Sequence, residues 1–511
     1  MSAAAQFTIE LAIYGLVPCS SKNWTAAASL RRLREQQEGW RCCQWKKKNT
    51  INLQGNCKTY ELRNGVWAFG HCEAITENAN PRQLPPDYTT TITCFILPSG
   101  SHEANPTELE QWSLNNLEMS IRDFTIDPLV DLIALVEQVM EPRDQYPFRL
   151  HLRQLSDGRP HPMAAQSTLT IGMKTIDPTE CVFGIQLQET SVGVLIKQQA
   201  GVADDYDYLA VWNWQTGDLE LTKVSDVAPY DDFAFIDSCS VMLAVMENPV
   251  ALQVYCFKKP KVYFAGAFLL PSTKDDFTYL ELHFDGGPSA SIAGPRSVDG
   301  TPYSLPPVPD ILAITFGVAE ARVNITESDV SGFTMVMSPR LMLDKLERNT
   351  ANIPKVKMRD QLRVLPWKDW GAECTRWIPE RLDSLNWQPS MQAGRYAVVV
   401  KVSENDAEGQ DNDDAPSLLL RKQAIHIYDF RTGTIHQNIR KGLKNGIQVL
   451  PTLATERAIF EENVFSCLPY HCVQSEPLPT LVSGVMIDEG RLVCTKIEET
   501  DEWRQLLVLT F

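Results

Sequence analysis

Short apolar runs rich in Val, Ile, Tyr, Phe and Trp recur along the chain from about residue 49 to the C-terminus. Most of these runs lie too close together for helices to fit between them, and turn-forming residues cluster in the gaps, as in connected β-strands. Residues 208–214, 234–245 and 251–257 illustrate the pattern. It predicts an all-β structure.

Two motifs of loosely similar form, which we call phrases, repeat within this pattern of short strands. An aromatic strand followed by a polar turn with glycine occurs at 212–218 (WNWQTGD), at 427–434 (IYDFRTGT) and, more weakly, at 152–159 (LRQLSDGR). We expect each copy to be the third strand of a small sheet turning into the fourth, with glycine supplying a positive φ. A second phrase, an aromatic-Ile-Asp strand end before an apolar run, occurs at 124–128 and 235–237 and predicts the inner strand pair of such a sheet.

Small repeated sheets that close on one another solve the problem of exposed strand edges in a β-propeller. The chain is therefore predicted to be all-β and β-propeller-like, with six or seven blades. A pair of unrelated β-sandwiches is the alternative that strand spacing leaves open.

The N-terminal part of the chain has a different pattern. Leu30, Leu33 and Trp40 are spaced three and seven residues apart, which predicts a helix over 25–45. Residues 22–48 are rich in Lys and Arg. This composition predicts a solvated helix face or, alternatively, a phosphate-binding patch. We divide the chain into an N-terminal helical segment, 1–48, and a propeller-like domain, 49–511.

Two insertions interrupt the propeller pattern. Residues 294–310 hold five prolines, which predicts extended backbone, and residues 404–414 are acidic and lack aromatic side chains. Both are expected to be solvent loops.

Composition narrows the possible partners. The 511 residues carry a net charge of −17, which repels phosphate backbones and makes nucleic acid an unsuitable partner. No run approaches 18 uncharged apolar residues, so we expect no membrane span, and the start lacks the basic region of a signal peptide. The 13 scattered cysteines favour a reducing compartment, the cytoplasm or nucleus.

No catalytic signature is present. The chain lacks a G-x-S-x-G elbow, a P-loop, an H-E-x-x-H helix, a G-x-G-x-x-G turn after a strand, and any C-x-x-C pair. We therefore expect no catalytic residue, no cofactor and no metal site. Two carboxylates brought together in space, as in glycosidases, stay open because the sequence does not show such a pair.

A tryptophan cluster is the strongest candidate for a binding site. Trp367, Trp370, Trp377 and Trp387 lie within 21 residues, interleaved with basic side chains that include Arg376. Trp and Arg are enriched in protein-binding hot spots, whereas packing between blades is the alternative role for such residues. The candidate protein-binding residues are Trp367, Trp370, Arg376 and Trp377.

Several phrases, in order along nearly the whole chain, resemble one family: the F-box proteins of mushroom-forming fungi, in which an F-box precedes a long propeller-like region. The phrases are QFTIELA at 6–12, LRRLREQ at 30–36, YEL at 60–62 with GVWA at 65–68, RDFTIDP at 122–128, WNWQTG at 212–217, PWKDWG at 366–371 with TR at 375–376, GRY at 394–396, LPY at 468–470 and SGVMIDE at 483–489.

The resemblance implies a non-enzymatic substrate-recognition module of an SCF-type ubiquitin ligase, binding an unidentified protein. The chain begins where the F-box should already have ended, so a Skp-type adaptor is an expected partner only if a missing F-box is restored. Either the chain lost the F-box, or the start codon was assigned downstream of the true one, or the propeller works without a ligase. An independent scaffold propeller and, third, a propeller hydrolase are the competing classes.

Overall fold

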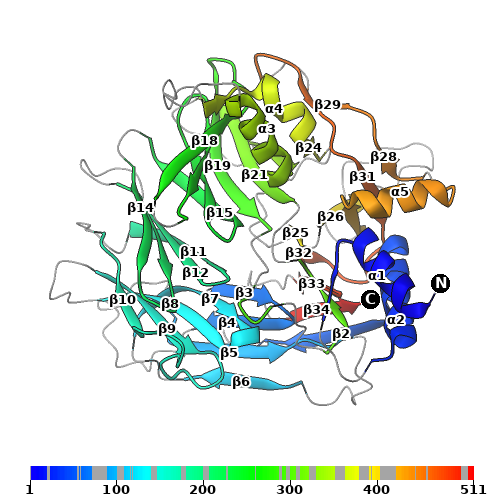
Figure 1. Cartoon of the computed structure of the whole chain (residues 1–511), viewed down its shortest axis with the longest axis horizontal. Helices are drawn as coiled ribbons and strands as arrows, with labels where there is room; N and C mark the ends of the chain where they lie inside the picture. The colour runs from blue at the N-terminus through cyan, green and yellow to red at the C-terminus, as the bar shows by residue number, and fades with distance from the viewer. Residues whose placement is uncertain are drawn as a thin grey trace, which may run out of the picture.

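Seven small sheets, antiparallel except for one added edge strand, are arranged in a ring and form a seven-bladed β-propeller (Figure 1). The computed structural model describes residues 2–19, 24–53, 57, 59–71, 89–99, 109–115, 117, 119–139, 147–173, 180–198, 206–225, 228–258, 261–286, 291–294, 300–306, 311–321, 330–351, 363–378, 391–392, 394–402, 422–443, 445–455, 459–496 and 505–511. The predicted fold is confirmed, and the sandwich alternative is wrong.

Blades one to three are regular four-stranded sheets, and in each the strands follow one another from the centre of the ring outward. Blade one contains β3 (Thr59–Arg63), β4 (Val66–His71), β5 (Thr91–Ile96) and β6 (Gln111–Leu114). Blade two contains β7 (Ile121–Asp127), β8 (Leu132–Gln138), β9 (Phe148–Gln154) and β10 (Thr168–Thr170), with the short helix η1 (Pro128–Val130) after β7. Blade three contains β11 (Cys181–Gln188), β12 (Ser191–Gln198), β13 (Tyr208–Asn213) and β14 (Leu219–Val224).

Blades four to six carry additional elements. Blade four contains β15 (Tyr230–Asp237), β16 (Ser240–Val245), β17 (Ala251–Cys256) and β18 (Tyr263–Leu269), with β23 (Val364–Leu365) added in parallel at its edge. Blade five contains β19 (Phe277–Asp285), β21 (Leu312–Glu320), β22 (Ser331–Met337) and β24 (Thr375–Trp377), with helices α3 (Pro339–Ala351) and α4 (Trp367–Cys374) between its last two strands. Blade six contains β25 (Met391–Gln392), β26 (Arg395–Val402), β27 (Lys422–Asp429), β31 (Tyr470–Gln474) and β28 (Ile447–Gln448).

Blade seven closes the ring with strands from both ends of the chain. It contains β32 (Val482–Asp488), β33 (Arg491–Lys496), β34 (Gln505–Thr510) and β2 (Lys47–Asn52). Strand β2 pairs with β34 along its whole length, from Lys47 opposite Thr510 to Asn52 opposite Gln505. A strand from near the start of the chain is thus hydrogen-bonded to the C-terminal strand, and this pairing holds the first and last blades of the ring together.

The predicted inner-strand phrase is confirmed, because residues 124–127 and 235–237 lie at the ends of β7 and β15, the first strands of their blades. The turn phrase is confirmed in blades two and three, where Gly158 (φ 73°) and Gly217 (φ 78°) follow the third strand. In blade six it is wrong. Strand β27 is the third strand, but helix α5 (Thr432–Arg440) follows it, and Gly433 permits close packing there, since a Cβ would lie 2.2 Å from the carbonyl oxygen of Ile13.

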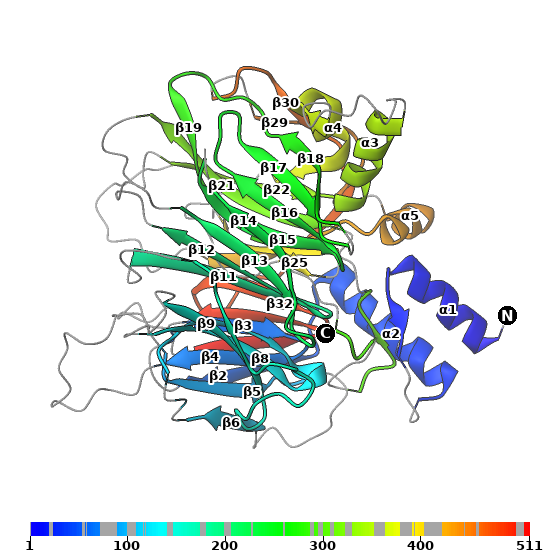
Figure 2. The same cartoon turned by 60° about the vertical axis from the view of Figure 1, so that its left-hand side comes forward.

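Two N-terminal helices, α1 (Ala3–Ile13) and α2 (Ala26–Cys42), form a cap on one face of the ring, on the same side as α5 (Figure 2). The helix predicted over 25–45 is confirmed, whereas α1 was not predicted. The predicted boundary at 48/49 falls inside β2.

The prediction of a solvent loop over 294–310 is wrong for residues 301–305, which are buried. Strand β20 (Tyr303–Ser304) pairs with β1 (Val17–Pro18), and the hydroxyl of Tyr303 donates to Gln36 of α2 (2.8 Å). The extended backbone therefore serves to hold the helical cap. Residues 404–414 lie outside the described residues.

Side chains of the innermost strands connect one blade to the next. Glu61 of β3 accepts the backbone N–H of Ile126 in β7 (2.8 Å), and Asp232 of β15 accepts that of Phe284 in β19 (2.8 Å). Gln186 of β11 both donates to and accepts from the backbone of β15. Each contact joins first strands that belong to different sheets, so the centre of the ring is held by polar groups as well as by the apolar packing between blades.

These contacts predict a pH-dependent stability. Burial raises the pKa of Glu61 to about 7 and that of Asp123 to about 6, above the values of about 4 in an unfolded chain. A carboxyl whose folded pKa is raised favours folding while it is protonated, so this contribution is lost as the pH rises from about 4 to 7. We expect Glu61→Gln to become more stable relative to the wild type over this range, by at most about 1.4 kcal/mol per pH unit.

Urea unfolding at pH 5, 6, 7 and 8 measures this difference. In the Glu61→Gln variant, the amide oxygen of the new side chain can still accept the N–H of Ile126 but does not titrate. Glu461→Gln, at an exposed position, is the matched control and should run parallel to the wild type. An equal pH slope for Glu61→Gln and the wild type would contradict the prediction.

Candidate interaction surface

Blade six differs from the regular blades in the chain between its third and fourth strands. Blades two and three turn within a few residues after the third strand, whereas blade six inserts residues 430–469. This blade-six insertion contains α5, β28, β29 (Thr452–Thr455) and β30 (Val464–Ser466). Figure 1 shows it along the rim of the ring, from α5 to β29.

Large apolar side chains that stay exposed gather in this insertion. Leu453 and Phe465 lie opposite each other on β29 and β30, and 48% and 46% of their surfaces are exposed. Leu450, just before β29, is 69% exposed. The described residues include fifteen exposed large hydrophobic side chains, of which six fall within 439–465. We call these six the apolar strip: Ile439, Leu443, Val449, Leu450, Leu453 and Phe465.

A buried arginine beneath the insertion holds the backbone of the strip. The guanidinium of Arg376, in β24 of blade five, donates to the carbonyl oxygens of Leu468 (2.6 Å) and Leu450 (3.3 Å) and to the hydroxyl of Thr452 (2.6 Å). Burial lowers the pKa of Arg376, and the ring of Tyr470 lies 5.4 Å from its guanidinium. Both ends of the β29–β30 hairpin are therefore tied to blade five by one side chain.

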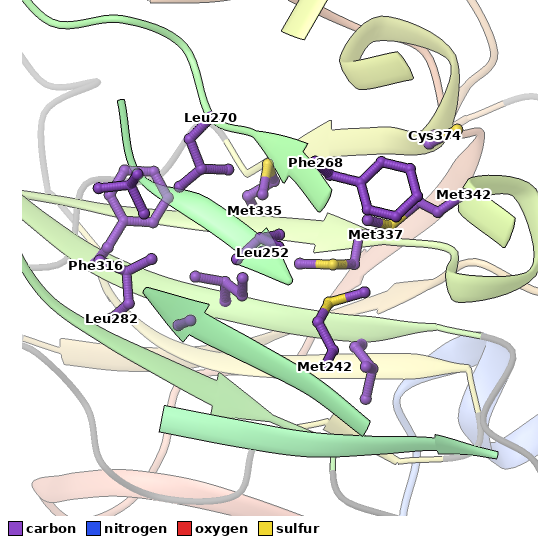
Figure 3. Packing of buried hydrophobic residues seen from close by; sticks show 14 of the residues in the cluster. Met242, Leu252, Phe268, Leu270, Leu282, Phe316, Met335, Met337, Met342 and Cys374 are labelled. Atoms are coloured by element: carbon purple, nitrogen blue, oxygen red, sulfur yellow. The ribbon is translucent and has the colours of Figure 1, made fainter. Parts of the chain in front are cut away.

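The tryptophans predicted to bind a partner are packed in the same region, inside the protein. Trp370 and Trp377 are 1% and 3% exposed, and the indole N–H of Trp370 donates to the carbonyl oxygen of Leu269 in blade four (3.0 Å). Trp367 is half-buried and contacts Trp370 edge-on. Figure 3 shows the neighbouring packing of Phe268 with side chains of α3 and α4.

The structure thus places Trp367, Trp370, Arg376 and Trp377 in the core-packing role that the sequence left as the alternative, and Trp387 lies outside the described residues. Their assignment to a binding rim stays a prediction, without support from their exposure. Sequence reasoning missed the apolar strip. The available signal was the charge-free stretch 446–453, GIQVLPTL, just after a helical pattern.

Arg376→Met should destabilise the protein, because it leaves the buried carbonyl oxygen of Leu468, the part-buried carbonyl oxygen of Leu450 and the Thr452 hydroxyl without their donor. We expect a loss of about 2–4 kcal/mol in the free energy of unfolding. Arg340→Met, at an exposed position of α3, is the control and should cost less than about 0.5 kcal/mol. Chemical unfolding of both variants tests this, and equal stabilities would show that Arg376 does not hold the insertion.

A buried ionic cluster joins the helical cap to the same blade. Asp429, at the end of β27, accepts from the side chains of Arg431 (2.9 Å) and Arg395 (3.3 Å). Gln37 of α2 accepts from both arginines (2.6 and 3.1 Å), and Arg431 also donates to the backbone of Tyr14 after α1. Burial disfavours the Asp429 carboxylate, but the two arginines outweigh it and lower the pKa of this carboxyl.

The remaining charges of the cap are largely paired. Arg34 pairs with Glu10, Arg41 with Glu38, and Lys46 with Glu35. The Lys- and Arg-rich stretch at 22–48 therefore presents less positive charge than its sequence indicates, which favours the solvated helix face over a phosphate site.

Asp429→Asn should loosen the cap, because it leaves two buried guanidinium groups without their carboxylate. We expect about 3–5 kcal/mol of destabilisation and faster amide hydrogen exchange in α2. Asp157→Asn is the control, since Asp157 pairs with Arg159 on the surface, where such pairs contribute under about 1 kcal/mol. Unchanged exchange in α2 would mean that the cluster does not hold the cap.

Neither a membrane helix nor a metal centre is found in the part of the chain that the structure describes. No described helix is long and apolar enough to cross a bilayer. The described residues contain no group of three or more His, Cys, Asp or Glu side chains placed to hold a metal ion.

Comparison with known proteins adds structural neighbours only. No protein-family model matches the chain, and no curated protein matches it in sequence. A protein from Listeria monocytogenes, lmo1340, is 9% identical, with a TM-score of 0.29 over 57% of this chain and 66%, just under two thirds, of its own. The WD40 domain of SCAP from fission yeast is 8% identical, with a TM-score of 0.32 over 91% of this chain and 98% of its own.

A prolyl endopeptidase is 9% identical, with a TM-score of 0.25, and the match covers 83% of this chain and 57% of its own. At such scores these likenesses assign no function. The class of the protein follows from its own strand order: a seven-bladed propeller closed by β2, with a helical cap and an insertion in blade six.

Proposed function

We propose that this chain is a non-enzymatic protein-interaction module that binds its partner through the apolar strip of blade six. The observation that carries this proposal is the exposure of six large apolar side chains within 27 residues, with the segment around Leu450 and Thr452 tied to blade five by Arg376. Isolated exposed apolar residues are common on protein surfaces, but gathered ones are typical of interaction sites. A backbone that is already ordered also lowers the entropic cost of binding.

Charges at the two ends of the strip give the proposed partner an orientation. Arg440 and Lys441 are exposed at the end of α5, and Glu461 and Glu462 are exposed before β30. A complementary partner would present apolar side chains between an acidic end, next to α5, and a basic end, next to β30.

We further propose that the module is the substrate-recognition half of an SCF-type ubiquitin ligase receptor, as the family resemblance implies. The helical cap supports this proposal, because a preceding F-box would be connected to the ring through α1 and α2, which a buried cluster of charges attaches to blade six. The cytoplasm or nucleus is the proposed location, and no disulfide joins the cysteines that the structure describes.

Charged substitutions in the strip test the binding surface. Leu450→Asp and Leu453→Asp place a carboxylate where an apolar contact is proposed, and we expect at least about tenfold weaker binding of a captured and then purified partner. Leu219→Asp is the matched control, because the exposure of Leu219 (53%) lies between those of Leu453 and Leu450, but Leu219 lies on the outer strand of blade three, outside the strip. Titration calorimetry compares the three variants, and equal affinities would overturn the assignment of the strip.

A second arm separates the ligase from an independent scaffold. An F-box fused ahead of Met1 should recruit the Skp-type adaptor and promote ubiquitination of a partner that binds the strip. Binding of the partner without ubiquitination favours the scaffold. The hydrolase alternative has less support, because Glu61 and Asp123, carboxylates of neighbouring inner strands, are occupied by hydroxyl and backbone donors of the ring.

A further inference from the structure

A second site lies away from the apolar strip, at the seam between blades seven and one. It is a cavity of about 200 Å³. Its lining comes from one face of β4, β5 and β6 and from the end of β2: Asn52, Phe69, His71, Thr91, Thr93, Phe95, Gln111, Ser113 and Asn115.

The face of blade one that forms this cavity changes character along its strands. Trp67 and Phe95, which face each other on β4 and β5, are buried against the closing blade. Further along the same face, the pairs become His71 with Thr91 and Thr93 with Ser113. The opposite face of the sheet remains apolar. The seam between blades is filled by apolar side chains at its inner part, whereas Gln111, Ser113 and Asn115 at its polar end are exposed, so the cavity is open to solvent there.

The described part of the lining is polar and uncharged. Among the described residues that line the cavity there is no Asp, Glu, Lys or Arg, and His71 is the one titratable side chain. His71 is hydrogen-bonded to Thr93 (3.1 Å), which is hydrogen-bonded to Ser113 (2.9 Å). Within the described residues, the side-chain amides of Asn52, Gln111 and Asn115 make no hydrogen bond, so they are available to a ligand.

We infer that this cavity binds an uncharged polyhydroxylated ligand the size of a single sugar ring. Amides, hydroxyls and an imidazole can each donate and accept, as a sugar hydroxyl does, whereas an ionised ligand would lose its hydration without meeting an opposite charge. The volume is below the roughly 300–1,000 Å³ of sites for drug-sized ligands but well above the ~30 Å³ of one water molecule. Phe69 and Phe95 supply the apolar part of the lining, which the C–H groups of the ring could contact.

Saturation-transfer NMR on the full chain tests the inference. The probes are the methyl glycosides of glucose, galactose, mannose and N-acetylglucosamine, with glucuronic acid and glucose 6-phosphate as charged counterparts. We expect transfer to at least one neutral glycoside and weaker transfer to both charged sugars. No transfer to any neutral glycoside, or tighter binding of a charged sugar, would overturn the inference.

Cavity-filling variants locate the site. Ser113→Phe should weaken binding of the neutral glycoside at least tenfold, whereas Thr222→Phe should not change it. Thr222 is a matched control because it is also an exposed hydroxyl residue on the outer strand of a blade, β14 of blade three. If Ser113→Phe does not fold, Gln111→Ala serves instead and should weaken binding several-fold. Binding that survives in a folded Ser113→Phe or Gln111→Ala variant would place the sugar elsewhere and refute the assignment.

Discussion

Pairing between β2 and β34 is the constraint from which most of the structure follows. Because β2 is the outermost strand of blade seven, the chain immediately before it must lie beside that blade, and α2 ends at Cys42, five residues earlier. Trp40 of α2 stacks on Phe511 after β34, with ring centroids 3.8 Å apart, and Arg32 donates to the Phe511 carbonyl. Closing the ring therefore also places the helical cap over blades six and seven.

The insertions that distinguish blades five and six from the regular blades lie next to the helical cap and the apolar strip. Blades two and three connect their last two strands without an additional helix, while blades five and six use this position for α3, α4 and α5. Residues 301–305, inserted in blade five, pair with β1 and reach α1 and α2 through Tyr303. The regular part of the ring thus provides a rigid body, and the insertions use it to fix the cap and the apolar strip.

Features set by local pattern were predictable from the sequence. Strand alternation, the aromatic-Ile-Asp phrase and the Leu30–Leu33–Trp40 spacing depend on neighbours in the chain, and the propeller, its inner strand pairs and α2 followed from them. The helix after β27 was missed because Thr432, Gly433 and Thr434 favour a turn locally, whereas packing against Ile13 decides their conformation.

The candidate binding site shows more clearly what the sequence alone could not predict. Trp and Arg are enriched both in binding hot spots and in the contacts of a large core, so composition could not separate the two roles. What decides the role of Arg376 is the set of oxygens that it meets, and these lie 74 to 92 residues away in the chain. The Trp367–Trp377 region supports the apolar strip from beneath instead of forming a surface. These contacts depend on the tertiary fold, because the residues that make them are far apart in the sequence.

Strand direction places the helical cap and the sugar-sized cavity at different ends of the strands. The cap contacts the ends where first strands turn into second strands, as Arg395 shows in blade six. The sugar-sized cavity lies where β4 ends and β5 begins, at the opposite end of the strands. A ligand there would meet neither the cap nor its ionic cluster. The closing pair β2–β34 contributes Asn52 to the cavity at this end and connects to α2 at the other end. A ligand in the cavity would therefore stabilise the pairing that closes the ring.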